Sequence, residues 1–194
     1  MDPEERRRRI ADALLHVAAD QGIQGVSLRQ VATAAGVTTG MVQHYFASKE
    51  EMLDFAWDVV SARVASRMSA VDPAAGPTAL VRALLVELLP LDERRRVEGR
   101  VSVSFYAHAT TYPAIADKLR TASAQLRSAV TDGIHTAQTA GELPASLDPS
   151  ATATGLLALV EGLGIQVHTE HYSSQQALDA FDAHVTALHH GPDR

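Results

Sequence analysis

The chain has 194 residues, of which 46% are hydrophobic, with 12 glycines and 8 prolines, a composition that excludes fibrous and disordered proteins and allows a substantial core. It has no cysteine, which excludes disulfide frameworks, thiolate metal sites and catalytic thiols. The formal net charge is -6, but residues 1–50 carry six acidic and six basic side chains, so the excess of acidic groups lies in residues 51–194.

The chain begins with a charged segment that ends in four arginines. This segment lacks the apolar core of a signal peptide, and the most apolar later stretch is interrupted by Glu161 and Gln166. We therefore expect a soluble, cytoplasmic protein without a membrane span. The cluster Arg6–Arg9 precedes a helix expected over Ile10–Gly22, where it either lies along a phosphate backbone or is simply solvated.

Residues 26–35 carry the start signals of a short amphipathic helix. Ser27 can cap it, and Gln30, three residues on, can return the bond. Arg29 is expected to face outward, because the apolar residues form one stripe on the opposite side. These residues are Leu28, Val31, Ala32 and Ala35.

A glycine turn and a second short helix follow. Gly36 stands where a left-handed turn is needed, and Thr38 or Thr39 can cap a helix whose inner residues are Val42 and Phe46. The pattern is typical of a helix-turn-helix whose second helix enters a DNA major groove about 12 Å wide. The residues expected at the groove are Thr38, Thr39, Gly40, Met41, Gln43, His44 and Tyr45.

A second capping box, Ser48 to Glu51, opens the next helix. It places Lys49 in the first turn, where unpaired backbone N–H groups already favour an anion. Lys49 is therefore a candidate phosphate clamp, although a lysine at such a position is often only solvated.

Residues from about Arg8 to Val59 resemble the DNA-binding domain of the TetR family of transcriptional repressors. The resemblance rests on three segments: SLRQVA at residues 27–32, AGV at the turn of residues 35–37, and YFASKE at residues 45–50, which leads from the second short helix into the next one. It implies that Ser27 and Lys49 hold phosphates and that Arg29 reaches a base or a phosphate.

The sequence departs from the usual family pattern at one place. Many members have two aromatic residues followed by histidine where this chain has Gln43, His44 and Tyr45. Glutamine can pair bidentately with adenine, so the departure affects the expected base preference rather than DNA binding itself.

Beyond residue 50 the pattern predicts helices throughout, so the fold class is all-α with about nine helices. We expect a three-helix DNA-binding domain over residues 1–50 and a helical ligand-binding and dimerisation domain over residues 51–194. A helix over residues 48–70 would connect the two.

Turn and cap signals divide the C-terminal half. Residues 71–76 form a loop, Pro77 begins a helix that Pro90 ends, and Asp92 caps the next helix, which stops at Tyr112. The first of these helices carries Leu80, Leu84 and Leu88, and the second carries Val97, Val101, Phe105 and His108 on one face. The last three helices are expected over residues 113–140, 149–171 and 174–190.

The helix over residues 149–171 is apolar nearly all round, so it must bury two sides, which implies a partner helix. Gly155, Gly162 and Gly164 would allow a close approach. TetR-like proteins form dimers through two long C-terminal helices, with the DNA-reading helices about 34 to 36 Å apart. The alternative is that this helix and the preceding one, over residues 113–140, both lie inside the core of a monomer. The residues assigned to the homodimer interface are Leu119, Leu126, Leu156, Leu159, Val160, Leu163 and Val167.

Residues 101–113 and 161–166 are similar to the ligand domain of the BetI-like branch of the family. The resemblance implies a pocket for a small-molecule effector, whose identity it does not give. Such pockets combine aromatic walls with a few polar atoms, although aromatic residues on a helix also serve as core. The candidate ligand residues are Phe105, Tyr106, His108, Tyr112 and His168, followed by Trp57 and Arg100.

Other functions were weighed against DNA binding. The pairs His168 and His171, and His189 and His190, lack a third ligand at suitable spacing, so no metal is expected, and no cofactor is implied. Phosphate loops, nucleophile elbows and paired carboxylates are missing, so we do not expect an enzyme. A protein-interaction module would leave Arg29, Gln43 and Lys49 without a role. The sequence thus favours a ligand-responsive repressor that binds a palindromic DNA operator as a homodimer.

Overall fold

The computed structural model describes residues 3–190, and within that range it contains nine α-helices and no strand, which confirms the all-α prediction. The helices are α1 (Pro3–Gly25), α2 (Leu28–Ala35), α3 (Thr39–Tyr45), α4 (Lys49–Ser69), α5 (Pro77–Val86), α6 (Glu93–Ala109), α7 (Pro113–Thr139), α8 (Pro149–His168) and α9 (Ser174–Ala187), with 3-10 turns at Pro73–Ala75 and Leu188–His190.

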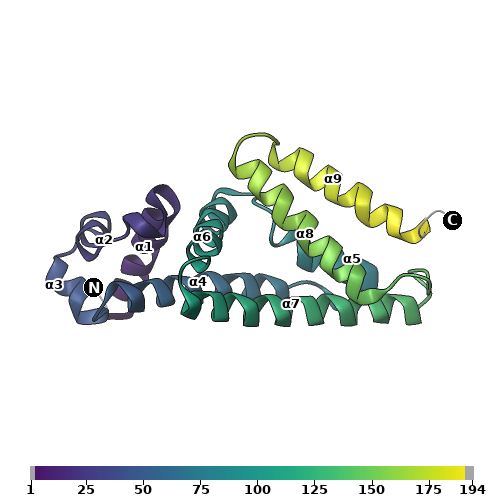
Figure 1. Ribbon diagram of the computed structural model, residues 1–194, viewed down its shortest axis with the longest axis horizontal. Helices are drawn as coiled ribbons and strands as arrows, with labels where there is room; N and C mark the ends of the chain where they lie inside the picture. Colours follow the sequence, from purple (N-terminus) through teal and green to yellow (C-terminus); the bar gives the residue numbers. More distant parts are fainter. Residues whose placement is uncertain (1–2, 191–194) are drawn as a thin grey trace.

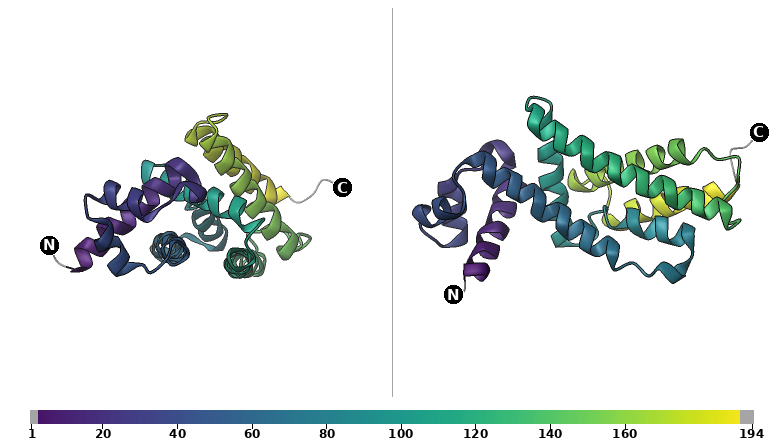
Figure 2. Two further views of the ribbon diagram at one scale, coloured as in Figure 1. Left: turned by 60° about the vertical axis from the view of Figure 1, so that its left-hand side comes forward. Right: turned by 90° about the horizontal axis from the view of Figure 1, so that it is seen from below.

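The molecule is elongated, with its two ends built from different helices. Helices α1, α2 and α3 gather at one end, α8 and α9 lie toward the other, and α6 stands between them (Figure 1). Seen from below, α4 leads away from the N-terminal end into α5, while α7 crosses the C-terminal half (Figure 2). Helix α6 packs against both α1 and α8, so it is a structural bridge between the two ends.

Two apolar clusters form the core. The first joins α1, α2 and α3 to the first half of α4 and to α6, with Ile10, Val42, Met52 and Val101 all fully buried. The second is built from α5, α7, α8 and α9 around Phe181. The N-terminal helices thus share a core with α4 and α6, although a domain boundary was expected at residue 50. A rotation of α4 would disturb this shared core directly.

Helix α5 buries a different stripe from the one its sequence suggested. Val81, Leu85 and Leu89 are the buried residues, whereas Leu80, Leu84 and Leu88 are only half-buried. The close approach of α5 to α7 explains the difference: a Cβ atom on Gly133 of α7 would lie 2.5 Å from Cγ2 of Val81. The helix also ends at Val86, several residues before Pro90.

The last three helices begin where expected, but α8 and α9 each end three residues early, and α9 continues as the 3-10 turn Leu188–His190. Glu170 adopts a left-handed backbone with φ of 59°, which no glycine or proline announced. The main-chain N–H groups of His171 and Tyr172 both donate to the carbonyl oxygen of Gln166 and close the helix end.

Helix α8 is long and apolar enough to cross a membrane by length and composition alone, with a mean hydropathy of 1.3 despite Glu161 and Gln166. It is the one such helix among residues 3–190. Its buried residues pack into the second core cluster, as expected of a core helix.

Candidate nucleic-acid interface and ligand region

The predicted cap of α2 is present, but its reciprocal bond differs. Oγ of Ser27 accepts a hydrogen bond from the main-chain N–H of Gln30 at 3.3 Å. The Ser27 hydroxyl in turn donates to Oε1 of Gln30 at 2.6 Å, and the Gln30 amide donates to Gln21. A hydroxyl has only one proton to donate. Ser27 must therefore release Gln30 before it can donate to a DNA phosphate.

The turn between α2 and α3 requires glycine for two reasons. Gly36 has φ of 63° and ψ of 38°, the left-handed conformation that was expected. A Cβ atom at this position would lie 2.7 Å from Nη2 of Arg9, so the arginine packs directly over the turn. The angle between the two short helices is thereby fixed by backbone geometry and by a neighbouring side chain.

Helix α3 is anchored on one side and free on the other. Oγ1 of Thr38 caps it by accepting from the N–H of Met41 at 3.2 Å. Val42 and Phe46 are buried as predicted. The exposed residues are Thr38, Thr39, Gly40, Gln43 and His44, whereas Met41 and Tyr45 are partly covered by the core.

Lys49 lies in the first turn of α4 and contacts the end of α1. Its Nζ atom donates to the main-chain oxygen of Gln24 at 3.0 Å. Ser48 caps α4 by accepting from the N–H of Glu51, while Glu51 accepts from the N–H of Ala47, one residue before the expected partner. An ammonium group has three donors, so Lys49 keeps two for a phosphate.

The arginines at the start of α1 point in different directions. Nη1 of Arg6 lies 3.9 Å from Sδ of Met41, and the Arg7 guanidinium lies over the ring of Phe55 at 4.9 Å. Since Arg9 covers the α2–α3 turn, the cluster does not form one continuous stripe for a phosphate backbone.

The aromatic residues predicted to bind a ligand do not share one cavity. Phe105 is 2% exposed, and its ring lies 5.3 Å from that of Trp57 within the first core cluster. His108 stacks on Tyr112 at 3.8 Å, and its Nδ1 atom lies 3.0 Å from Nε2 of Gln24. Phe105 is thus core, and the histidine–tyrosine pair lies at the junction with α1.

The remaining two candidates lie where α6 meets α8. The Tyr106 hydroxyl donates to Oε1 of Glu161 at 3.3 Å, and burial together with the Glu161 charge raises the pKa of Tyr106. His168 is half-buried against Gly99, and its pKa is lowered by burial and then by the charges of Arg100 and Arg96.

Two neighbouring clefts of about 510 and 400 Å³ lie between α1, α4 and α6. None of the five predicted ligand residues lines either cleft, nor does Trp57 or Arg100. The clefts share Asp12, Arg63 and Arg94, so both carry several charged groups, and Phe55 is the one aromatic residue other than His16 among their lining residues.

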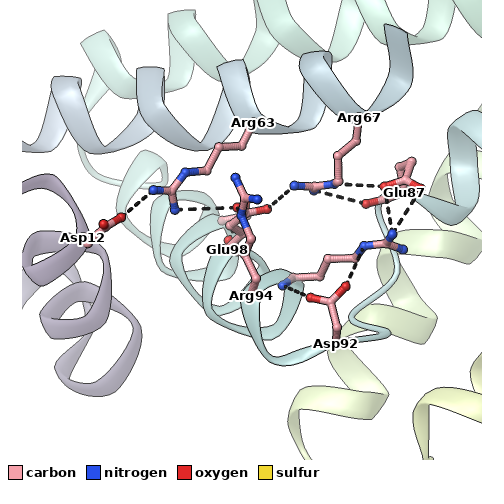
Figure 3. A network of polar contacts seen from close by, with 9 residues as sticks. Asp12, Arg63, Arg67, Glu87, Asp92, Arg94 and Glu98 are labelled. Atoms are coloured by element: carbon pink, nitrogen blue, oxygen red, sulfur yellow. Dashed lines mark hydrogen bonds and ion pairs between the residues drawn. The ribbon is translucent and has the colours of Figure 1, made fainter. Parts of the chain in front are cut away.

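An ion-pair network that the sequence analysis missed crosses this region (Figure 3). At its centre is Glu98 of α6, 3% exposed, whose carboxylate lies 3.8 Å from Arg63, 2.8 Å from Arg67 and 3.2 Å from Arg94. The signal was present in the sequence, because Glu98 interrupts the buried face of α6 between Val97 and Val101 and stands four residues after Arg94.

The network extends in both directions from Glu98 (Figure 3). Arg63 pairs with Asp12 of α1 at 2.5 Å, and Arg67 pairs with Glu87, which follows α5, at 2.9 Å. Glu87 also pairs with Arg95 at 3.1 Å. Helix α4 is therefore connected by its own arginines to α1 on one side and to α6 and the end of α5 on the other.

Most residues assigned to a dimer interface are used inside the protomer. Five of the seven are buried in its core and are not presented at the protomer surface, whereas Leu126 and Leu159 are half-buried. The five buried residues are Leu119, Leu156, Val160, Leu163 and Val167.

The exposed face of α8 lies on the opposite side of the helix. Ile165 is 46% exposed, and a Cβ atom on Gly155 or Gly162 would meet no heavy atom within 4 Å. Gly164, in contrast, is buried next to Pro90. Two of the three glycines are thus open to a neighbouring helix, and the third is not.

The histidine pairs have other contacts. His171 Nδ1 lies 2.9 Å from Oγ1 of Thr169, and His189 Nδ1 lies 2.9 Å from the main-chain oxygen of Glu142. Among residues 3–190 no group of three histidine, cysteine, aspartate or glutamate side chains is placed to hold a metal ion.

Comparison with known proteins identifies the two halves of the chain. Residues 10–55 match the family profile described as bacterial regulatory proteins, tetR family, and residues 77–190 match that of the BetI-type transcriptional repressor, C-terminal. The regulator BetI of Rhizobium meliloti is 28% identical over 162 residues, which cover 83% of this chain and 77% of that protein. The regulator PksA of Bacillus subtilis is 35% identical over 112 residues, 56% of this chain and 54% of that protein.

Solved structures agree in fold. A transcriptional regulator from Rhodococcus sp. Rha1 superposes with a TM-score of 0.83 at 31% identity, covering 96% of this chain and 97% of the other. A regulator from Saccharomonospora viridis, solved in complex with choline, has a TM-score of 0.80 at 24% identity and covers 98% and 100%. These relatives are regulators, not enzymes. The chain belongs to the TetR family of DNA-binding transcriptional regulators.

Proposed function

We propose that this protein is a repressor that binds a palindromic operator as a homodimer and is released from it by a small molecule. The observation that carries the proposal is the orientation of helix α3. Val42 and Phe46 are buried in the core, so Gln43 and His44 are exposed to solvent next to the start of α4 at Lys49. Such a helix can enter a major groove, where side-chain amides read base edges and a lysine nearby holds a phosphate.

The DNA-binding residues keep their proposed roles, with one condition. Lys49, Arg29 and Ser27 would contact the backbone or nearby bases, and the residues of α3 would read the groove. Because the Ser27 hydroxyl donates to Gln30 in the free protein, its contact to a phosphate requires that this bond break on binding.

A dimer is supported by the exposed face of α8. Gly155 and Gly162 leave open space along this face, and Ile165 adds exposed apolar surface beside them. A two-fold axis at this face would make each α8 pack against its copy, with self-complementary contacts. Two copies of α3 would then meet two half-sites, which is why a palindromic operator is expected.

Regulation by a small molecule is supported by the position of α4 and by one structural neighbour. The S. viridis regulator is solved with choline, which makes a small-molecule effector reasonable for the fold without naming the effector of this chain. Helix α4 begins at Lys49 and carries Arg63 and Arg67 into the ion network. A ligand that favours the non-binding orientation of α4 would need a coupling of about 1 to 3 kcal/mol. The regulator would act in the cytoplasm.

The test is selection of bound fragments from random double-stranded DNA, followed by sequencing. An enriched palindrome is expected, and Gln43→Ala should change the preferred base pair at one position in each half-site. Gln125→Ala, at an exposed glutamine of α7, is the matched control and should leave the preference unchanged. Absence of any enriched site, or an enriched site without two-fold symmetry, would contradict the proposal.

A further inference from the structure

The larger of the two clefts lies between α1, α4 and α6. It has a volume of about 510 Å³ and is walled by α1, by the middle of α4 and by the start of α6. This volume falls in the range of about 300 to 1,000 Å³ that is usual for small-molecule sites.

Positive charge dominates the cleft. Its lining residues include five arginines and a single carboxylate, Asp12. Glu98 and Glu87 balance part of this charge through Arg63, Arg67 and Arg94. Arg7 and Arg8 pair with no carboxylate among the described side chains, and the Arg94 side chain remains 61% exposed. The cleft therefore has guanidinium groups that are available to an incoming anion.

One wall of the cleft is apolar. It is formed by Phe55, Val59 and Ala62 along one side of α4. The guanidinium of Arg7 lies 4.9 Å above the Phe55 ring, so a cation–π contact orients it at the edge of this wall. An occupant that matched both parts would have an anionic group at the arginines and an apolar part against the wall.

A DNA phosphate does not match the cleft as a whole. Arg7 and Arg8 lie on α1 near the DNA-reading end, but Arg63, Arg67 and Arg94 come from α4 and α6. A phosphate backbone also has no apolar part to cover Phe55 and Val59. A small organic anion satisfies all of these groups together, because guanidinium forks bind carboxylates and phosphates bidentately.

We infer that this cleft binds an organic anion with an apolar portion, and that occupancy of the cleft biases the orientation of the DNA-reading helices. The inference builds on the proposed function, because it assigns a location and a charge to the effector. Its physical basis is that α1 carries two of the available arginines, Arg7 and Arg8, whereas α6 carries the third, Arg94. An anion held by both sets links α1 to α6 and shifts the equilibrium toward one arrangement of α1 and α4.

The test uses octanoate as a probe, with calorimetric titration of the full chain in the absence of DNA. Ala62→Glu places a negative charge on the apolar wall, and Ala65→Glu places the same charge on α4 outside the cleft. Both alanines are exposed, so both variants are expected to fold, which unfolding curves would verify. Octyltrimethylammonium supplies the same tail with the opposite charge, and sulfate supplies an anion without a tail.

Octanoate is expected to bind the wild type and Ala65→Glu equally, and to bind Ala62→Glu at least about tenfold more weakly. The ammonium probe should not bind, and sulfate should bind more weakly than octanoate. The inference is overturned if octanoate fails to bind, if its affinity for Ala62→Glu equals its affinity for the wild type, or if either control probe binds as tightly as octanoate. Because no DNA is present, failure of the cleft is distinguishable from failure to select an operator.

Discussion

The ammonium group of Lys49 donates a 3.0 Å hydrogen bond to the main-chain oxygen of Gln24, and the side-chain amide of Gln24 lies 3.0 Å from His108 of α6. The proposed phosphate clamp is thus held by the end of α1, and that end is in contact with the C-terminal region. A shift of α6 relative to α1 would therefore change the position of Lys49 through the His108–Gln24 and Gln24–Lys49 contacts.

Replacement of Lys49 by alanine should weaken binding to all DNA sequences alike. The lysine would contact a phosphate rather than a base, so the loss should be independent of sequence and the salt dependence should fall by about one charge. Fluorescence anisotropy titrations at several salt concentrations would measure both effects. Lys118→Ala on α7 removes the same charge from a lysine that pairs with Asp54 of α4 and is not expected to contact DNA, so it is the control. Equal slopes for the wild type and Lys49→Ala would refute the phosphate contact.

Replacement of Glu98 by glutamine should destabilise the protein by about 3 kcal/mol or more, because it leaves partly buried arginines without their shared carboxylate. Glu93→Gln is the control, since Glu93 is exposed and its pairs with Arg96 and Arg100 are 3.7 Å long. It should cost no more than about 1 kcal/mol. Urea unfolding gives both free energies, and similar values for the two variants would show that the network contributes little.

Replacement of Ile165 by arginine should dissociate the proposed dimer, because it would put a charge on the exposed face of α8. Val103→Arg on α6 is the control, since Val103 has a similar exposure of 39%. Sedimentation velocity separates the two forms. Leu163→Arg is not a suitable variant, because Leu163 is buried inside the protomer and its replacement would test folding instead. If the Ile165→Arg protein remained dimeric, the interface would have to lie on another face.

Replacement of Gly99 by alanine tests the crossing of α6 and α8. The new Cβ atom would lie 2.3 Å from Nε2 of His168, so the imidazole must move, at a cost of about 1 to 3 kcal/mol. In a His168→Ala background the obstacle is gone, and the same substitution should stabilise the protein by about 0.5 to 1 kcal/mol through helix propensity. Thermal unfolding of the four proteins in this cycle measures the difference. The same effect of Gly99→Ala in both backgrounds would contradict the contact.

The stability of the protein should fall as the pH drops below about 6.5, in part because of His168. Burial, followed by the charges of Arg100 and Arg96, holds the pKa of His168 below its usual 6.5. Between that lowered pKa and 6.5 the unfolded chain binds more protons than the folded one, so the free energy of unfolding decreases with decreasing pH. His168→Gln should flatten this dependence in urea titrations on both sides of pH 6.5. An exposed histidine, His135, serves as the control through His135→Gln. An unchanged pH slope in His168→Gln would disprove the assignment.

The sequence predicted well those features that depend on a few neighbouring residues. Ser27 caps α2, Gly36 takes the left-handed turn and Asp92 caps α6, because each needs only a backbone conformation and a side chain within reach. The buried positions of α3 were also correct, since its one apolar stripe has a single way to face the core.

Features that depend on contacts between distant segments were not predictable in the same way. Leu84 and Leu85 are equally apolar, and only the approach of α7 at Gly133 decides which one is buried. Leu163 and Ile165 are both large apolar residues of α8, yet one fills the core and the other faces solvent. The network around Glu98 required knowledge that α4 and α6 cross, which no periodicity supplies.

The start of α5 depends on a residue far along the chain. Helix α5 has no side-chain cap of its own, and the N–H of Thr78 donates instead to Oε2 of Glu142, 64 positions later. During synthesis on the ribosome, α5 emerges well before this acceptor exists. Its first turn therefore becomes complete only after translation has passed the end of α7, so the start of α5 should acquire protease resistance only once Glu142 has been synthesised.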